Sequence, residues 1–190
     1  QNGIAVYVLN AESLFDVSED LRKLGTLLQT ASQADNAATT LDNRRHAIHN
    51  ELGTCSLEEE CDYPEKPRRP VFVQISKEPL FTIGREAFLN DIINAAGGRS
   101  VTADVSTAFP KLSKETASAL NPEVIILSDS PDNLEPNDAF KNSPAVKNGR
   151  VYKINADIIS RPGPRLVDAL EQIARLLHPE KFETGEKENS

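Results

Sequence analysis

The pattern of apolar and polar residues along the chain predicts a mixture of buried strands and amphipathic helices. Residues 4–9 form a short, continuous apolar run, which is typical of a buried strand. Ser13, followed three residues later by Asp16, gives a helix-capping signal, and leucine and valine then recur at helical spacing over residues 14–28. The pattern stays helical over residues 32–52 but includes few apolar side chains, which predicts a helix of about 30 Å that lies across a surface.

A second set of elements follows residues 53–70, a loop-like stretch rich in proline and acidic side chains. Its apolar runs and helical repeats predict, in order, strand 71–75, helix 86–96, helix 113–120, strand 124–127, a helical turn at 137–141, strand 150–154 and helix 164–177. Strands that are almost continuously apolar and alternate with helices are typical of a parallel sheet covered on both faces. The predicted class is therefore α/β, with a parallel sheet flanked by helices.

These patterns divide the chain into four parts. Residues 1–30 contain the first strand and helix, and residues 31–69 contain the long helix and the cysteine-containing loop. Residues 70–179 form the main α/β unit. Residues 180–190 are rich in Glu and Lys and have no evident apolar anchor, so a disordered tail is expected there.

Composition narrows the class of function. The chain of 190 residues has a net charge of −8, with 38% hydrophobic and 26% charged residues, as in soluble globular proteins. Its positive residues are scattered, which argues against nucleic acid as a partner and disfavours binding to anionic membrane surfaces. No apolar run approaches the roughly 20 residues that cross a bilayer.

Two cysteines and two histidines are the candidates for special chemistry. Cys55 and Cys61 lie close together in the proline-rich loop, where a disulfide is predicted and free thiols or a metal site are the alternatives. His46 and His49 share one face of the long helix, but neither a third ligand nor a metalloprotease pattern accompanies them. No serine-nucleophile motif is present. The sequence therefore predicts a protein that is not an enzyme and has no cofactor or metal site.

Two aromatic and two basic residues lie in loops that follow the carboxyl ends of predicted strands, the edge where open α/β sheets bind ligands. Phe81 and Phe109 either offer apolar surface to a ligand or fold onto the core. Arg161 and Arg165 stand beside Pro162 and Pro164 at the start of the last predicted helix, where the helix dipole disfavours cations. An anionic ligand or partner is one explanation for these arginines, and a solvated surface is the other.

Several segments resemble, in order and spacing, the second lobe of the cobalamin- and siderophore-binding proteins, the class III substrate-binding proteins of ABC importers. The matching segments are Arg69-Pro70-Val71-Phe72-Val73-Gln74-Ile75, Pro79-Leu80-Phe81-Thr82-Ile83-Gly84, residues 88–98, Phe109-Pro110-Lys111-Leu112-Ser113-Lys114-Glu115, Asn121-Pro122-Glu123-Val124-Ile125-Ile126 and residues 161–177. Residues 6–28 also resemble the end of the first lobe and the start of the connecting helix, so the likeness covers residues 3–178.

The resemblance implies one lobe of a two-lobed binding protein whose lobes are joined by a rigid helix. Such a protein is exported, is periplasmic or extracytoplasmic, and delivers its ligand to a membrane permease. The implied ligand is a corrinoid such as cobalamin, or else a ferric siderophore or haem. Glu115 matches the second-lobe glutamate that docks into the permease. The residues that face the ligand by the same analogy are Phe81, Phe109, Asp157, Ile158, Ile159 and Arg161.

Two departures from the family pattern qualify these implications. The last ligand loop has Ile158 and Ile159 where cobalamin binders tend to offer bulky aromatic residues, and the chain has no tryptophan. Most of the first lobe, with its own docking glutamate, is also missing. An alternative function is therefore a half-lobe protein that self-associates through the face left exposed and has no transport ligand. A third hypothesis, an enzyme, requires a metal at His46 and His49.

Overall fold

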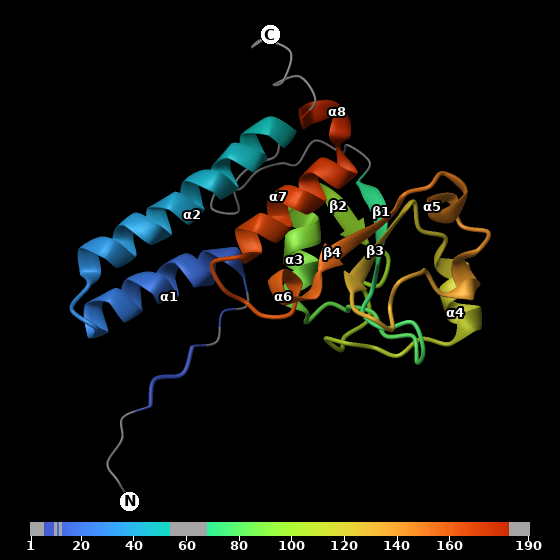
Figure 1. Ribbon diagram of the computed structural model, residues 1–190, viewed down its shortest axis with the longest axis horizontal. Coiled ribbons are helices and arrows are strands. Elements are labelled where there is room, and N and C mark those ends of the chain that lie inside the picture. Colours follow the sequence, from blue (N-terminus) through green and yellow to red (C-terminus); the bar gives the residue numbers. More distant parts are fainter. Residues whose placement is uncertain (1–5, 10, 12, 54–67, 183–190) are drawn as a thin grey trace, which may run out of the picture.

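The computed structural model describes residues 6–9, 11, 13–53 and 68–182. Its first part is a helical hairpin of α1 (Leu14–Leu27) and α2 (Ala31–Leu52), drawn in blue and cyan in Figure 1. The predicted capping of α1 is confirmed, because the Asp16 backbone N–H donates to the Ser13 hydroxyl and the Ser13 N–H donates to the Asp16 carboxylate. The predicted long second helix is confirmed as well.

The hairpin is attached to the rest of the molecule through α2, which runs beside α7 (Leu166–Leu177) in Figure 1. The Arg44 guanidinium donates to both carboxylate oxygens of Glu171, at 2.8 Å each, and to Asp168 at 2.7 Å. A bidentate pair of this kind fixes orientation as well as distance. None of the described helices combines the length and apolar character needed to span a membrane.

The second part is a parallel four-stranded sheet with the strand order β2-β1-β3-β4. The strands are β1 (Arg69–Gln74), β2 (Gly98–Ser100), β3 (Val124–Asp129) and β4 (Val151–Asn155). Helices cover the sheet on both sides in Figure 1. The predicted α/β class, with a parallel sheet flanked by helices, is confirmed.

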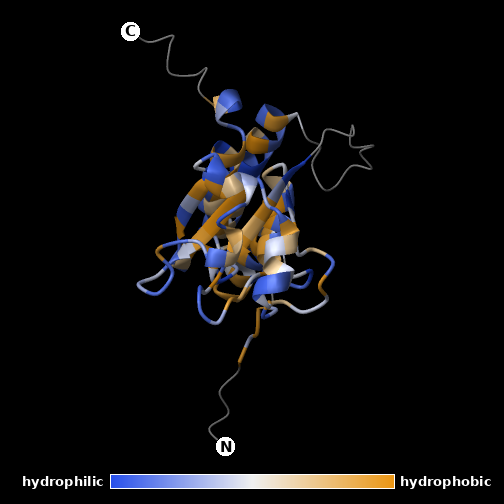
Figure 2. Cartoon of the chain, turned by 90° about the vertical axis from the view of Figure 1, so that its right-hand side faces the viewer, coloured by the Kyte–Doolittle hydropathy of each residue, from blue (hydrophilic) through white to orange (hydrophobic). Residues whose placement is uncertain are grey.

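Successive side chains of β1 enter two different cores, as the period of two in a strand requires. Val71 and Val73 pack on the side covered by α3 (Phe88–Ala95) and α7. Phe72 packs on the opposite side, where its ring centroid lies 4.4 Å from that of Phe140. Figure 2 shows hydrophobic residues concentrated on the strands and hydrophilic residues on the outer helix surfaces. The near-continuous apolar strands are therefore explained by burial on both faces.

The remaining helices are short. They are α4 (Lys114–Leu120), the 3-10 helix η1 (Asp138–Phe140), α5 (Pro144–Lys147), α6 (Ala156–Ile159) and α8 (Pro179–Phe182). Ser113 caps α4 as predicted, since its hydroxyl accepts from the Thr116 N–H at 3.1 Å. The elements β2, α5, α6 and α8 were not predicted, because three or four residues are too few to show a hydrophobic period.

Two expectations about the ends of the chain are wrong. Residues 6–9 form no strand, and Val6 and Val8 are 81% and 79% exposed. A strand needs a neighbour for its backbone hydrogen bonds, and in the described part of the chain none lies beside this segment. Residues 180–182 are part of α8, and the Phe182 ring packs under Arg175, whose guanidinium carbon is 5.0 Å from the ring centroid. Phe182 is therefore the apolar anchor that the sequence analysis overlooked.

Some expectations fall on residues that the structure does not describe. They include residues 4 and 5 of the expected strand, residues 183–190 of the expected tail, and both Cys55 and Cys61. The disulfide remains a prediction.

Candidate ligand-binding edge of the sheet

The parallel strands bring the loops that follow them to one edge of the sheet, here called the carboxyl edge. It is formed by residues 75–87 after β1, residues 101–113 after β2, residues 130–137 after β3, and α6 with residues 160–165 after β4. These loops lie along the lower side of the sheet in Figure 1. In open α/β folds this edge is the usual place for a ligand.

The first two of these loops pair with each other and bring Phe81 and Phe109 onto neighbouring segments. The Thr82 N–H donates to the Pro110 carbonyl at 3.1 Å, and the Leu112 N–H donates to the Leu80 carbonyl at 3.0 Å. Phe109 is 52% exposed, whereas Phe81 is half-buried. Both loop phenylalanines therefore lie at the carboxyl edge, and about half of the Phe109 surface is open to solvent.

A buried network of amide side chains fixes the loop after β3 to the end of β1. Gln74, Asn133 and Asn137 are at most 1% exposed. The Gln74 Nε2 donates to Asn133 Oδ1 (2.6 Å) and to the Glu135 carbonyl (2.9 Å), and Gln74 Oε1 accepts from the Asn137 N–H (2.7 Å). The Asn133 Nδ2 donates to the carbonyls of Gln74 (2.9 Å) and Ser128 (2.8 Å). Because the amides of Gln74 and Asn133 are paired at both nitrogen and oxygen, the network holds residues 130–137 in one arrangement.

Two lysines on the same edge are paired with carboxylates. Lys77 Nζ lies 3.5 Å from a carboxylate oxygen of Glu135, and Lys114 Nζ lies 3.2 Å from one of Glu78. These side chains are mostly exposed, so the pairs contribute little to stability. They neutralise Lys77 and Lys114, whereas the exposed Asp129 and Asp132 beside the loop after β3 form no ion pair with another described residue.

The segment after β4 separates into buried and exposed residues. Ile158 and Ile159 are each 4% exposed and belong to the core beside α7, so the expectation that they face a ligand is corrected to a packing role. They are buried because α6 turns its apolar side towards the sheet. Asp157 and Arg161 are exposed, and Arg161 forms no ion pair with any other residue in the described ranges. These two polar residues remain the candidates from this loop.

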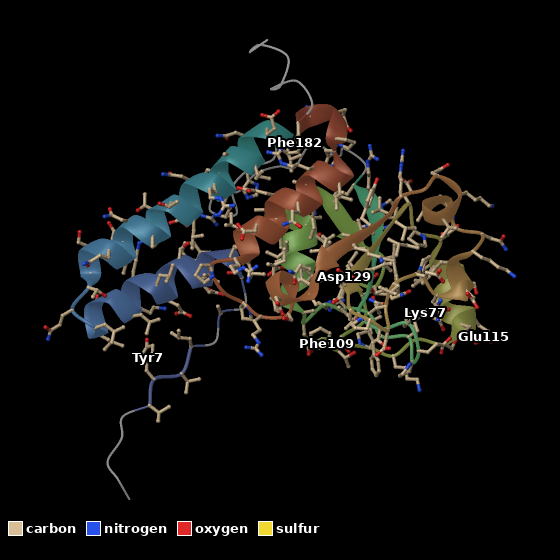
Figure 3. All side chains as sticks on the ribbon, viewed as in Figure 1. Tyr7, Lys77, Phe109, Glu115, Asp129 and Phe182 are labelled. Atoms are coloured by element: carbon tan, nitrogen blue, oxygen red, sulfur yellow. The ribbon has the colours of Figure 1, made fainter. Side chains whose placement is uncertain are left out.

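Glu115 lies in the first turn of α4 and is exposed. A hydrogen bond from its own backbone N–H, and a second one from the Ser113 hydroxyl, lower the pKa of Glu115 below its usual range. The side chain is therefore a carboxylate at neutral pH. Figure 3 shows Glu115 and Lys77 on the same side of the sheet unit, with Phe109 well separated from Glu115.

The histidine pair lies away from this edge, on α2. His46 Nδ1 is 2.7 Å from the Asp42 carbonyl oxygen, and His49 is 3% exposed. Burial lowers the pKa of His49, and the neighbouring charges of Arg45 and His46 lower it further. Among the described residues no group of three His, Cys, Asp or Glu side chains is arranged to hold a metal ion.

Sequence reasoning missed two features of the carboxyl edge. Leu134 is an apolar residue that is 53% exposed in the loop after β3. Gln74 is a buried amide at the end of an otherwise apolar strand. The signal for both was an exception to the local hydrophobic pattern: an apolar residue in a polar loop and a polar residue in an apolar strand.

Comparisons with known proteins agree with this arrangement. The family model described as "Periplasmic binding protein" matches residues 1–158. An ABC transporter substrate-binding lipoprotein of Bacillus subtilis, YvrC, is 28% identical over 184 residues, which are 95% of this chain and 56% of the relative. The vitamin B12-binding protein of Pectobacterium carotovorum is 30% identical over 175 residues, covering 92% of this chain and 59% of the relative.

Solved structures with the same fold include Helicobacter pylori CeuE with Ni(II) bound, at a TM-score of 0.78 and 23% identity, covering 97% of this chain and 58% of that one. The vitamin B12-binding protein BtuF of Vibrio cholerae matches at a TM-score of 0.70 and 21% identity, covering 93% and 66%. The chain therefore spans little more than half the length of the curated relatives that it matches.

Proposed function

The chain belongs to the periplasmic binding protein family, and we propose that it is one lobe of the substrate-binding component of an ABC importer. The observation that carries this proposal is the family match over residues 1–158, which includes three of the four loops at the carboxyl edge and all but the last residue of α6. The family consists of exported proteins that bind solutes and are not enzymes. The chain is accordingly placed outside the cytoplasmic membrane, and no catalytic role is assigned to it.

The ligand proposed is a corrinoid, with a ferric siderophore or haem as the next choices. Support comes from the exposed Phe109, from the half-buried Phe81 on the adjoining loop, and from the exposed Arg161 and Asp157 after β4 at the same edge. An edge that offers both an aromatic face and an exposed cation suits a ligand that has an apolar surface and an anionic group. Vitamin B12 is also the ligand in the names of several relatives.

Isothermal calorimetry with cyanocobalamin, haemin and ferrichrome tests the ligand. Binding of at least one of the three is expected, and it should weaken in Phe109→Ala. Leu28→Ala is the control, since this apolar residue is also exposed (68%) and lies at the far end of α1. The ligand proposal fails if none of the three compounds binds at millimolar concentration.

We assign Glu115 as the contact with the permease. It is exposed, its pKa is lowered so that it is charged at neutral pH, and it lies at a distance from Phe109 (Figure 3). A permease bound there would leave the ligand contacts free. Glu115→Lys should abolish binding to the importer reconstituted in nanodiscs, while the control Glu51→Lys on α2 should bind normally. Equal binding of both variants would contradict the assignment.

A second candidate function is self-association of this half-lobe. Four apolar residues on the α1 side are strongly exposed, namely Val6 (81%), Val8 (79%), Leu27 (57%) and Leu28 (68%). A mainly apolar pocket of ≈160 Å³ lies between α1 and residues 162–164, with Leu9 and Leu24 among its lining residues. Figure 2 shows the apolar segment at residues 6–9 extending away from the body of the protein. Sedimentation equilibrium tests this function, and a monomer mass at all concentrations would contradict it.

A further inference from the structure

The sheet unit exposes only two large apolar side chains, and both lie at its carboxyl edge. Nine such side chains are exposed among the described residues, and seven of them lie within residues 6–28. The other two are Phe109, at 52%, and Leu134, at 53%. Scattered exposed apolar residues need no explanation, but two that share the edge expected to bind a ligand suggest a common purpose.

Leu134 is held in its exposed position by its neighbours in the chain. Asn133, immediately before it, is 0% exposed; its amide oxygen accepts one hydrogen bond and its amide nitrogen donates two. The Asn133 backbone N–H also donates to the Ser130 carbonyl at 3.0 Å. On the other side, the Glu135 carbonyl accepts from Gln74 at 2.9 Å. A residue fixed between two buried anchors contacts a ligand at a smaller entropic cost than one in a mobile loop.

The loop also connects Leu134 with the predicted aromatic residues. The Glu135 carboxylate pairs with Lys77, four residues before Phe81. Phe81 in turn forms a backbone bridge to Lys111, two residues after Phe109. Three adjoining loops therefore present one apolar side chain each, and the cation beside Leu134 is neutralised.

We infer that Leu134 is a specificity-determining contact that selects ligands with an apolar face. This inference rests on the proposed function of the carboxyl edge, and it adds a loop that the family resemblance did not supply. Corrin and porphyrin rings have such a face, whereas a ferric hydroxamate peptide such as ferrichrome offers mainly polar groups. Leu134 thus favours cyanocobalamin or haemin over ferrichrome.

The test is NMR titration of residues 1–190 with cyanocobalamin, haemin and ferrichrome separately, because chemical shifts detect even millimolar binding. We expect the methyl signals of Leu134 to shift together with the aromatic ring signals of Phe109. Leu134→Ser should weaken binding of cyanocobalamin or haemin about tenfold, which corresponds to about 1.4 kcal/mol. Leu28→Ser, an exposed leucine on the other side of the molecule, should bind as the unmodified chain does.

Each other outcome has a distinct meaning. If Phe109 and Arg161 respond to a ligand while Leu134 does not, the inference is overturned and the proposed function stands. If Leu134 responds only to protein concentration, it is a contact between copies of the chain, and the inference is again overturned. If no probe shifts any signal of the carboxyl edge, the proposed ligand site itself is refuted.

Discussion

Replacing Asn133 by alanine tests whether the buried amide network holds the carboxyl edge together. Asn133→Ala removes the donor to the carbonyls of Gln74 (2.9 Å) and Ser128 (2.8 Å), and also the acceptor for Gln74 Nε2 (2.6 Å). Gln74 keeps its second bond, to the Glu135 carbonyl. Two buried carbonyls thus lose a partner, and each such loss costs about 1–3 kcal/mol. Allowing for relaxation, we expect the free energy of unfolding to fall by about 3 kcal/mol.

Urea unfolding followed by circular dichroism measures this loss. With an m-value of about 2 kcal/mol per molar, the midpoint should fall by about 1.5 M without a change in m. Asn142→Ala, at an exposed position, is the matched control and should unfold like the unmodified chain. A midpoint for Asn133→Ala within about 0.3 M of that control would refute the reasoning, because a loss below about 0.6 kcal/mol is too small for two unpaired buried carbonyls.

A second substitution at the same position separates hydrogen bonding from packing. Asn133→Asp keeps the shape of the side chain but turns a carboxylate oxygen towards two carbonyls. Burial and these carbonyls raise the pKa of the introduced carboxyl group, so the folded state binds its proton more tightly than the unfolded state does. Stability of this variant should therefore increase as the pH falls from 7 towards 4. An unchanged pH profile would mean that the side chain had left the network.

Three further predictions concern positions outside the network. Gly97 and Gly149 both have positive φ. At Gly97 an added Cβ would lie 2.6 Å from His178 Nε2, whereas at Gly149 it would meet no atom within 4 Å. In urea unfolding, Gly149→Ala should therefore cost about 1–2 kcal/mol and Gly97→Ala clearly more; equal losses would contradict the clash. The lowered pKa of His49 means that the unfolded state binds more protons than the folded state below about pH 6.5. The free energy of unfolding should therefore fall between pH 7 and pH 5. His49→Gln should make this fall smaller. The carboxylates that bind Arg44 are about a third exposed, so Arg44→Ala should cost only about 1 kcal/mol, and less in 1 M salt; a larger, salt-independent loss would argue for packing instead.

The helices and strands that the sequence predicted well share one property: their signal is local. The capping pair before α1, the leucine spacing along α7 and the apolar runs of β1 and β3 all lie within a few residues of one another. By contrast, β2 has three residues and is a strand only because β1 lies beside it. The segment at residues 6–9 is the opposite case: its sequence is typical of a strand, but no described neighbour pairs with it.

The candidate site was only partly predictable for a related reason. Phe81 and Phe109 could be placed at one edge from strand order, because parallel strands end on the same side. Ile158 and Ile159 could not be assigned, since an apolar residue after a strand suits either a ligand contact or the core, and only their burial decides for the core. Leu134 stood out only as an apolar residue in a polar loop, which does not tell whether its side chain is buried or exposed.

The sequence by itself therefore determined the α/β class, the main elements and the edge at which a ligand would bind, because each of these depends on periodicity and order along the chain. Only the tertiary structure decided which side chains at that edge are exposed and can contact a ligand. The amides of Gln74 and Asn133 are 59 residues apart, and their pairing arises only when β1 and the loop after β3 are brought together. No local pattern encodes such a contact, because the burial of each amide costs free energy unless a hydrogen-bond partner distant in the chain is brought to it.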